Sequence, residues 1–242
     1  MLASDIKPIE FLNDLGLAPE YAESLDFSLI QLAMMHSSYS ADNSLGALHN
    51  NERLEFYGDS VLKLACSKFL YETFPDKNEG ILSSYRSVLV SDNFLAKYAN
   101  DINLDKYLIF SDRSDLKTEK AHSTMLACAF EALLAALFMK IGFEPVYEFL
   151  EDIFKNYIGY VEANILKLNA KAALQEYTQG KDKTLPVYNL VSETGKAHEK
   201  IFKVEVLYND KVAGCGQGRS KKEAEQEAAY DACVKFGVID NE

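Results

Sequence analysis

Three acidic residues stand at helical spacing in the stretch NNERLEFYGDSVLKLA, which covers residues 50–65. Glu52, Glu55 and Asp59 are three and then four residues apart, which places their carboxylates on one face of a helix. Like charges stacked in this way repel one another, so the cluster needs a physical reason. It is either a solvent-exposed helix face or a site for a divalent cation, because carboxylate oxygens are preferred ligands of Mg²⁺ and Mn²⁺.

A fourth acid, Glu131, stands alone in the segment STMLACAFEALLAALFMK. This segment is apolar almost all round, so we expect a largely buried helix, in which an unpaired carboxylate costs several kcal/mol. If the two helices pack together, Glu55, Asp59 and Glu131 converge on one pocket lined by oxygen atoms. A cation held there activates water and neutralises charge on phosphate, which is the chemistry of phosphodiester hydrolysis.

The elements that must position these acids are helices. Helical periodicity predicts helices over roughly residues 5–15, 27–38, 50–73, 79–90, 92–99, 119–141 and 144–160. No strand pattern appears before about residue 185. We therefore predict an all-α first domain over residues 1–162.

The pattern changes around residues 162–170, and we predict a smaller α+β domain over residues 168–238. A short helix, AKAALQEYTQ, precedes the polar turn GKDKT. Three period-2 segments follow, LPVYNLVSE, IFKVEVLYN and KVAGCGQG, and they predict an antiparallel meander. Ser220 and Glu223 form an S-x-x-E capping box that begins a last helix. The predicted order of elements is α-β-β-β-α.

Composition and charge set limits on the class of protein. The chain has 242 residues, 48% of them hydrophobic, and a net charge of -12. Residues 168–242 hold 11 basic and 12 acidic residues, so the remaining 14 basic and 25 acidic residues lie in the first 167. Four distant cysteines, without a CxxC pair, predict neither disulfides nor a zinc site. No signal peptide or membrane span is expected, and a cytoplasmic protein is predicted.

Several motifs, in order along the chain, resemble the ribonuclease III family. NNERLEFYGDSVL resembles the family signature NERLEFLGDAVL, and MLACAFEALLAALF resembles ILADTFEALIGAIY. HSSYS at residues 36–40 and EGILSSYRSVLVS resemble the family's flanking segments. The C-terminal module resembles a double-stranded RNA-binding domain. The resemblance covers almost the whole chain and implies a metal-dependent endoribonuclease of double-stranded RNA that processes ribosomal precursor and other structured RNAs.

The resemblance also implies roles for individual residues. Glu55, Asp59 and Glu131 match the metal-binding carboxylates, and Asp59 and Glu131 match the two that are treated as catalytic. Glu52 and Glu79 match auxiliary acids of the same valley. Phe56 matches an aromatic residue that inserts into the partner subunit of a homodimer. The implied cofactor is Mg²⁺, with Mn²⁺ as a substitute, and neither a small-molecule cofactor nor a membrane is implied.

One position departs from the family pattern. The family's fourth carboxylate lies three residues before Glu131, where this chain has Cys128. A thiol is a soft ligand and a poor substitute for oxygen at Mg²⁺, so Cys128 is either a further candidate ligand or a small buried hydrophobe. No acid in the same segment is placed to compensate. Cys128 therefore motivates an alternative hypothesis, a non-cleaving double-stranded RNA-binding or ribosome-associated protein on the same fold.

The last helix of the second domain is a candidate phosphate-binding element. Lys221 and Lys222 lie in its first turn, where free N–H groups, the helix dipole and the lysines all attract phosphate. The resemblance adds Gln175 and Glu176, which match residues at one RNA minor groove, and His198, which matches a loop histidine at the next. The family's loop proline is Lys196 here. Such a module reads the shape of about 16 base pairs of A-form duplex.

A glycine-rich segment, GCGQG at residues 214–218, offers a third hypothesis, a nucleotide-binding enzyme. Its spacing is not G-x-G-x-x-G, and no βαβ unit surrounds it. A tight connection between a strand and a helix is the better interpretation.

Overall fold

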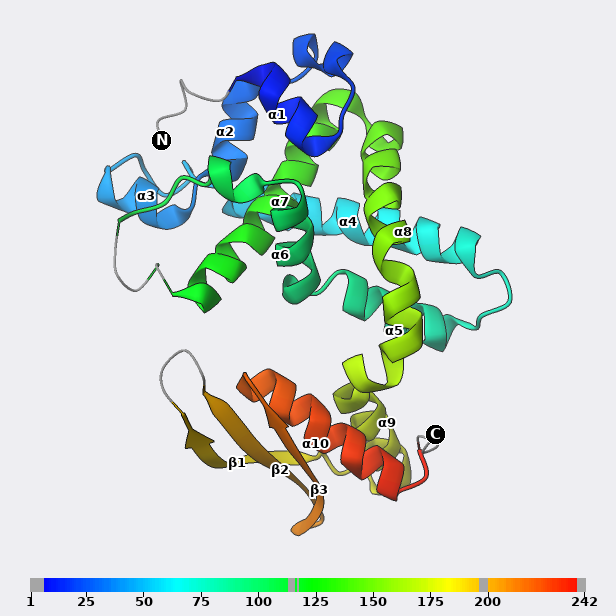
Figure 1. The fold of residues 1–242 in the computed structure, drawn as a ribbon. Helices are drawn as coiled ribbons and strands as arrows, with labels where there is room; N and C mark the ends of the chain where they lie inside the picture. Colours follow the sequence, from blue (N-terminus) through cyan, green and yellow to red (C-terminus); the bar gives the residue numbers. More distant parts are fainter. Residues whose placement is uncertain (1–6, 113–115, 117, 196–199, 239–242) are drawn as a thin grey trace. The chain divides into compact units, whose positions relative to one another are not determined.

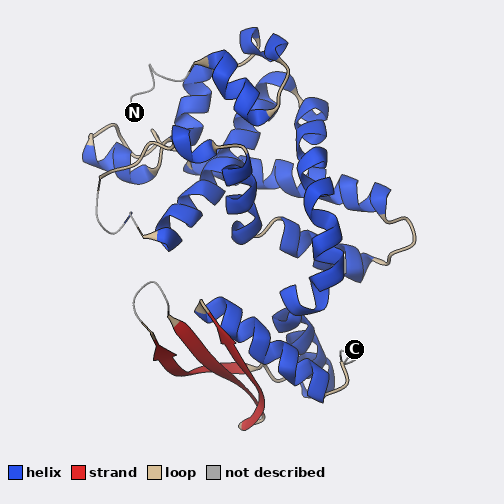
Figure 2. Cartoon of the chain, viewed as in Figure 1, coloured by secondary structure: helices blue, strands red, loops and turns tan. Residues whose placement is uncertain are grey.

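The computed structural model describes residues 7–112, 116, 118–195 and 200–238. It divides into two compact units, Met1–Gly159 and Tyr160–Glu242. The first unit contains helices and the second contains a sheet with helices (Figures 1 and 2). Both predicted fold classes are therefore confirmed, an all-α domain followed by an α-β-β-β-α module.

The first unit is built from α-helices and two short 3₁₀ helices, η2 and η3. These elements are α1 Pro8–Leu15, η2 Pro19–Glu23, α2 Phe27–Met34, α3 Ser37–Asp42, α4 Glu52–Thr73, α5 Glu79–Leu89, α6 Asp92–Asp101, η3 Leu104–Tyr107, α7 Glu119–Ile141 and the first part of α8 Phe143–Leu168, which continues past the end of this unit at Gly159. Helix α8 continues beyond the predicted end at residue 160, because the segment EANILKL contains no helix breaker. The segment predicted as one helix over 27–38 is divided between α2 and α3 by the extended residues Met35 and His36.

Helix α7 is the centre of the first unit. Its middle residues, from Met125 to Leu137, are buried except at positions 128 and 131, and α2, α4 and α6 pack against it. The helix is long and apolar enough to cross a membrane, but most of its apolar window is buried inside the unit. A core helix passes the same test, so α7 is weak support for a membrane span.

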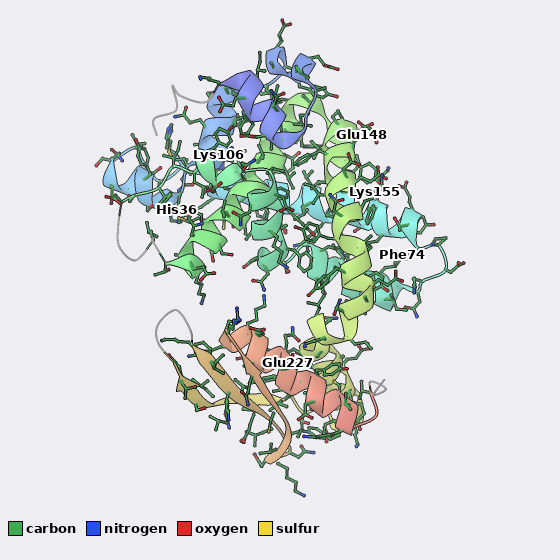
Figure 3. The ribbon with its side chains drawn as sticks, in the orientation of Figure 1. His36, Phe74, Lys106, Glu148, Lys155 and Glu227 are labelled. Carbon is green, nitrogen blue, oxygen red and sulfur yellow. The ribbon has the colours of Figure 1, made fainter. Side chains whose placement is uncertain are left out.

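The HSSYS segment positions the start of α4. The backbone N–H of His36 donates to the carbonyl of Ile109 at 2.8 Å, and the N–H of Asn51 donates to the carbonyl of Met35 at 2.9 Å. The His36 ring, labelled in Figure 3, accepts a hydrogen bond from the Ser38 N–H at the start of α3. The side chain of Asn50 accepts from the N–H of Glu52 at 3.1 Å. These bonds fix where α4 begins and therefore where its acids lie.

Gly58 permits the closest approach between α4 and α7. A Cβ atom added at Gly58 would lie 1.7 Å from the carbonyl oxygen of Glu131 and 3.3 Å from the backbone nitrogen of Ala135. Only glycine allows two helix backbones to lie this close. The contact falls between the acids Glu55 and Asp59 in sequence, so it brings both of them to the level of Glu131.

The second unit is a three-stranded antiparallel sheet with two helices. Its elements are α9 Ala170–Asp182, β1 Val187–Thr194, β2 Ile201–Tyr208, β3 Lys211–Gly218 and α10 Lys221–Lys235. The strand order is β1-β2-β3, and a bulge at Val191 interrupts the pairing of β1 with β2. The helix α9 is longer than predicted and includes most of the expected turn GKDKT. A core of small and branched residues, including Leu174, Val204, Val206 and Ala228, joins the sheet to the helices.

The segment GCGQG lies within β3, which corrects its interpretation as a connection between strand and helix. A Cβ atom at Gly214 or Gly216 would lie 2.3 Å from a backbone oxygen of α10, and one at Gly218 would lie 2.7 Å from the backbone nitrogen of Ala224. Side chains alternate between the faces of a strand, so these three glycines form one inward-facing row. The row lets α10 lie directly on the strand, which is a packing function.

Candidate nuclease site

The predicted acids of the two segments lie at the interface between α4 and α7. Glu55 and Asp59 come from α4, and Glu131 and Cys128 come from α7; all four side chains are partly buried. Each acts electrostatically on others of the set. We call these four residues the acidic cluster.

Glu131 has the most perturbed environment of the cluster. Burial, followed by the charges of Asp59 and Glu55, raises the pKa of Glu131 to about 8 from an ordinary value of 4.5. The carboxylate forms no hydrogen bond or ion pair with another described residue. Among the described residues, Lys63 is the cation that lowers the pKa of Glu131, and its effect is smaller than those of burial and of the neighbouring acids. An added cation would therefore be stabilised strongly at this position.

Cys128 acts as a hydrogen-bond donor in the cluster. Burial and the neighbouring carboxylate of Glu55 raise the pKa of the Cys128 thiol to about 12, so the thiol is neutral near pH 7. It donates a hydrogen bond to the Glu55 carboxylate. Burial raises the pKa of Glu55 as well, and this hydrogen bond partly opposes the rise. Position 128 therefore contributes no negative charge here.

The remaining predicted acids differ in their surroundings. Asp59 forms an ion pair with Lys63 one turn further along α4, at 2.7 Å. Glu52 is exposed, and its charge acts on Glu55 and on the half-buried ring of His36. Glu79 is exposed at the start of α5, where it accepts a hydrogen bond from Ser83 at 2.7 Å. No described contact joins Glu79 to the acidic cluster, and its role stays a prediction.

The structure adds one acid that the sequence did not indicate. Asp92, the first residue of α6, raises the pKa of Glu55, Cys128 and Glu131 through its charge. Its position in the sequence is remote from both motifs, and a single acid at a helix start is common. Helix α6 packs against α7, and the charge of Asp92 acts on the cluster from the start of α6.

The donor atoms of the cluster fit a hard divalent cation. The carboxylates of Glu55, Asp59 and Glu131 supply oxygen ligands, and the unpaired, partly buried Glu131 is the group that a cation would stabilise most. Within the described part of the chain, no three His, Cys, Asp or Glu side chains gather tightly enough to form a coordination sphere. The carboxylates repel one another in the absence of a cation, and the fit rests on the chemical type of the donors.

The start of α10 has the features expected of a phosphate site. Lys221 and Lys222 are exposed in its first turn. The Ser220 hydroxyl accepts from the N–H of Glu223 at 3.1 Å, and the Glu223 carboxylate accepts from the N–H of Arg219 at 2.8 Å. The first hydrogen bond of the predicted capping box is therefore present. In the second, the Glu223 carboxylate accepts from the N–H of Arg219 instead of that of Ser220.

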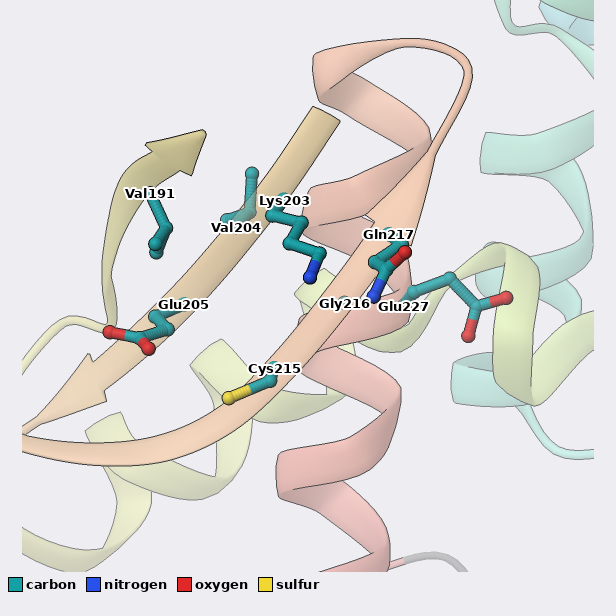
Figure 4. Close-up of a pocket in the computed structure, with 8 residues that line it drawn as sticks. All are labelled: Val191, Lys203, Val204, Glu205, Cys215, Gly216, Gln217 and Glu227. Atoms are coloured by element: carbon teal, nitrogen blue, oxygen red, sulfur yellow. The ribbon is translucent and has the colours of Figure 1, made fainter. Parts of the chain in front are cut away.

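The other predicted RNA-binding residues are only partly described. Gln175 and Glu176 are both exposed on α9. His198 and the neighbouring Lys196 lie outside the described residues. A hollow in this unit, shown in Figure 4, is lined by Val191, Lys203, Val204, Glu205, Cys215, Gly216, Gln217 and Glu227. Its lining combines a lysine with two glutamates and apolar groups, and we assign it no catalytic role.

Comparison with known proteins defines the class of both units. The Ribonuclease-III-like family model matches residues 26–157, and the double-stranded RNA binding motif matches residues 170–235. Ribonuclease 3 of Desulfotalea psychrophila is 40% identical over 212 residues, which cover 88% of each chain. Ribonuclease 3 of Streptococcus pneumoniae strain Hungary19A-6 is 40% identical over 215 residues, which cover 88% of this chain and 91% of the relative.

A solved structure agrees with the sequence comparisons. The nuclease domain of ribonuclease III from Campylobacter jejuni, in which one region is involved in dimer formation, matches with a TM-score of 0.53 and 29% identity. The match covers 62% of this chain and 97% of that domain. The chain therefore belongs to the ribonuclease III family. Its two domains support an endoribonuclease that acts on double-stranded RNA.

Proposed function

We propose that the chain is a divalent-metal-dependent endoribonuclease that hydrolyses phosphodiester bonds of double-stranded RNA. The observation that supports the metal dependence is Glu131, a partly buried carboxylate that pairs with no other described residue and whose pKa is raised by burial and by the charges of Asp59 and Glu55. Glu55, Asp59 and Glu131 would hold Mg²⁺, or Mn²⁺ in its place. A bound divalent cation supplies a Lewis acid that activates water and neutralises charge on the phosphate.

The residues of the chain prepare this chemistry. Glu131 must lose a proton to bind a cation, because its raised pKa keeps it largely protonated at neutral pH. Asp59 is already paired with Lys63. To bind a metal ion, the Asp59 carboxylate would have to leave Lys63 or interact with Lys63 and the metal ion together. Asp59 and Glu131 are the proposed catalytic residues, with Glu52 and Glu79 as auxiliary acids.

The second unit is the proposed RNA-binding module. Lys221 and Lys222 at the α10 N-terminus would contact phosphate, and the exposed residues Gln175 and Glu176 would reach a minor groove. The first 167 residues carry most of the negative charge of the chain and repel RNA. A tethered module offsets this repulsion by raising the local concentration of duplex at the nuclease unit.

The proposed assembly is a homodimer formed through α4. Phe56, Leu64 and Tyr71 are 80%, 59% and 75% exposed, and their spacing places them on one face of this helix. Such a stripe of large apolar side chains is typical of a protein interface. We place the enzyme in the cytoplasm, where the four free cysteines would stay reduced, with ribosomal precursor stems among its substrates.

A second candidate function follows from Cys128. Position 128 is a carboxylate in the family pattern and a neutral thiol here, so the site has one negative charge fewer with which to hold a metal ion. The alternative is therefore a non-cleaving double-stranded RNA-binding or ribosome-associated protein.

One experiment separates the two functions. A long RNA duplex is incubated with the parent chain, Glu131→Gln or Cys128→Asp, in Mg²⁺ or Mn²⁺ and in chelator. Cleavage by the parent that requires the metal and is lost in Glu131→Gln supports the enzyme. Tight binding without cleavage, with cleavage gained in Cys128→Asp, supports the binding protein. Cleavage by Glu131→Gln at the parental rate would overturn the assigned site.

A further inference from the structure

The sheet of the second unit has one side that faces away from the core with α9 and α10. Val204 and Val206 of β2 are buried in that core. Because side chains alternate along a strand, the residues between and beside these two valines project from the opposite side, and they are Ile201, Lys203, Glu205 and Leu207. Cross-strand partners share a face, which adds Val187, Val212, Cys215 and Gln217. We call the side formed by these residues the outer sheet face.

The outer sheet face exposes several apolar side chains. Val187 and Val212 are each more than half exposed, and Ile201 is exposed as well. Val191, at the bulge of β1, is also more than half exposed and lines the hollow drawn in Figure 4 together with Lys203. Apolar side chains gathered on one exposed face are typical of a surface that binds another protein.

Two opposite charges lie at the middle of this face. Lys203 and Glu205 are two residues apart on β2, between the apolar residues Ile201 and Leu207. The two charged side chains form no hydrogen bond or ion pair with each other or with another described residue. A partner that covered the face would bury both charges, and a buried charge without a counterpart is costly. The partner should therefore place an acid opposite Lys203 and a cation opposite Glu205.

A second copy of the same face meets this requirement. When two identical faces pack about a two-fold axis, each contact between two different residues occurs twice, with the roles of the copies exchanged. If the axis passes between Lys203 and Glu205, each lysine lies opposite the glutamate of the other copy, and Ile201 lies opposite Leu207. Duplex RNA fits less well, because its phosphates repel Glu205. An apolar segment would leave both charges unpaired.

We propose that the outer sheet face binds the same face of a second copy of this chain, with Lys203 of each copy paired to Glu205 of the other. Three strands of eight residues form the face, which corresponds to an area on the order of 400 Å². A stable interface buries about 800 Å² per partner. The association is therefore weak and reversible, and it is separate from the α4 interface and from the metal site proposed above.

Cys215 provides a direct probe of this association. It lies on the outer sheet face as the cross-strand partner of Glu205, and its side chain is exposed. Cys66 and Cys233 are buried, and Cys128 is partly buried. The test is cross-linking of the full chain with a bismaleimide, with the fraction of covalent dimer measured on a denaturing gel. The parent chain should form the covalent dimer, and Cys215→Ser should not.

Exchange of the two charges makes the test specific. Lys203→Glu should reduce cross-linking about 10-fold or more, because each attraction between the copies becomes a repulsion. Lys203→Glu combined with Glu205→Lys should restore it, because the pairing about the two-fold axis is kept. Lys211→Glu is the matched control and should leave cross-linking unchanged. It changes the net charge equally, and its cross-strand partner Tyr208 belongs to the opposite side, where the tyrosine hydroxyl donates to Asp182 of α9.

Three results would overturn the inference. They are a parent chain that forms no covalent dimer through Cys215, equal cross-linking of Lys203→Glu and Lys211→Glu, and a double variant that cross-links as little as Lys203→Glu. Protection of Cys215 from a monofunctional maleimide by duplex RNA, in Lys203→Glu, would assign the face to RNA and would also overturn it. Sedimentation velocity reports the α4 homodimer separately, so a Lys203→Glu variant that loses cross-linking and stays dimeric supports a second, distinct contact.

Discussion

At the scale of single residues, the nuclease unit contains an acid whose environment opposes its charge. Glu131 lies in the apolar middle of α7, and the charges of Asp59 and Glu55 reinforce the effect of its burial. A group of this kind is a functional candidate because the fold places a charge where charge is costly. The same cost gives the metal-free protein a measurable dependence of stability on pH.

We predict that the free energy of unfolding of the metal-free chain decreases as pH rises from about 4.5 to about 8 because of Glu131. In this range folded Glu131 keeps a proton that the unfolded chain releases, so higher pH favours unfolding. Urea unfolding in chelator at several pH values, compared between the parent and Glu131→Gln, measures this contribution. Glu131→Gln should reduce the decrease, and parallel curves for the two proteins would contradict the prediction.

At the scale of elements, the site depends on how closely helices can approach one another. The contact of α4 with α7 at Gly58 and that of α10 with the glycine row of β3 both require the absence of a Cβ atom. In each case the helix that approaches closely carries predicted site residues, the acids of α4 in the first unit and the lysines of α10 in the second.

Gly58→Ala should destabilise the nuclease unit by about 1–3 kcal/mol or more, because the added methyl group collides with the backbone of α7. Gly159→Ala is the control, since a Cβ atom there meets nothing within 4 Å. The Gly159→Ala substitution should leave the free energy of unfolding unchanged or raise it by up to about 1 kcal/mol, because alanine has the higher helix propensity. Urea unfolding followed by circular dichroism measures the free energy of unfolding of each variant. Equal changes in the two variants would contradict the prediction, because helix propensity alone would then account for both substitutions.

The start of α10 gives a second prediction at this scale. Replacing Lys221 and Lys222 with alanine should weaken duplex binding and reduce the slope of log K against log salt concentration by about 1 for each phosphate that is no longer neutralised. Lys211→Ala, at the start of β3, should leave the slope unchanged. Filter binding at several salt concentrations measures the slopes, and an unchanged slope in the double variant would exclude this helix start as a phosphate site.

At the scale of the whole molecule, helix α4 carries two different groups of side chains. One flank carries Glu55 and Asp59, and the adjacent face carries the exposed apolar residues Phe56, Leu64 and Tyr71. An interface formed on that face would place a second acidic cluster on the partner subunit, which suits a reaction that cuts both strands of a duplex.

Phe56→Asp should convert the proposed homodimer to monomers, because the introduced charge would be buried in the interface without a partner. Ile9→Asp, at an exposed position of α1, is the control and should leave the dimer intact. Sedimentation velocity of the full chain measures the change. A monomeric parent chain, or a Phe56→Asp variant that stays dimeric, would exclude α4 as the interface.

The sequence alone determined much of this protein. Helical periodicity identified the all-α unit, period-2 segments identified the three strands, and Glu131 was evident as the lone acid of the apolar segment STMLACAFEALLAALFMK. These features are local, since each depends on residues within a few turns of one another. The cysteine at position 128 was also visible, because its motif differs there from the family pattern.

Tertiary structure decided which distant groups became neighbours. Gly58 brings α4 against the backbone of Glu131, and the charges of Asp59 and Glu55 from α4 and of Asp92 from α6 act on Glu131. No spacing rule relates these residues, because they meet only when three helices pack. Packing also showed that the glycines of GCGQG make room for α10. Local patterns fix secondary structure, whereas the electrostatics of a site depend on every helix that packs around it.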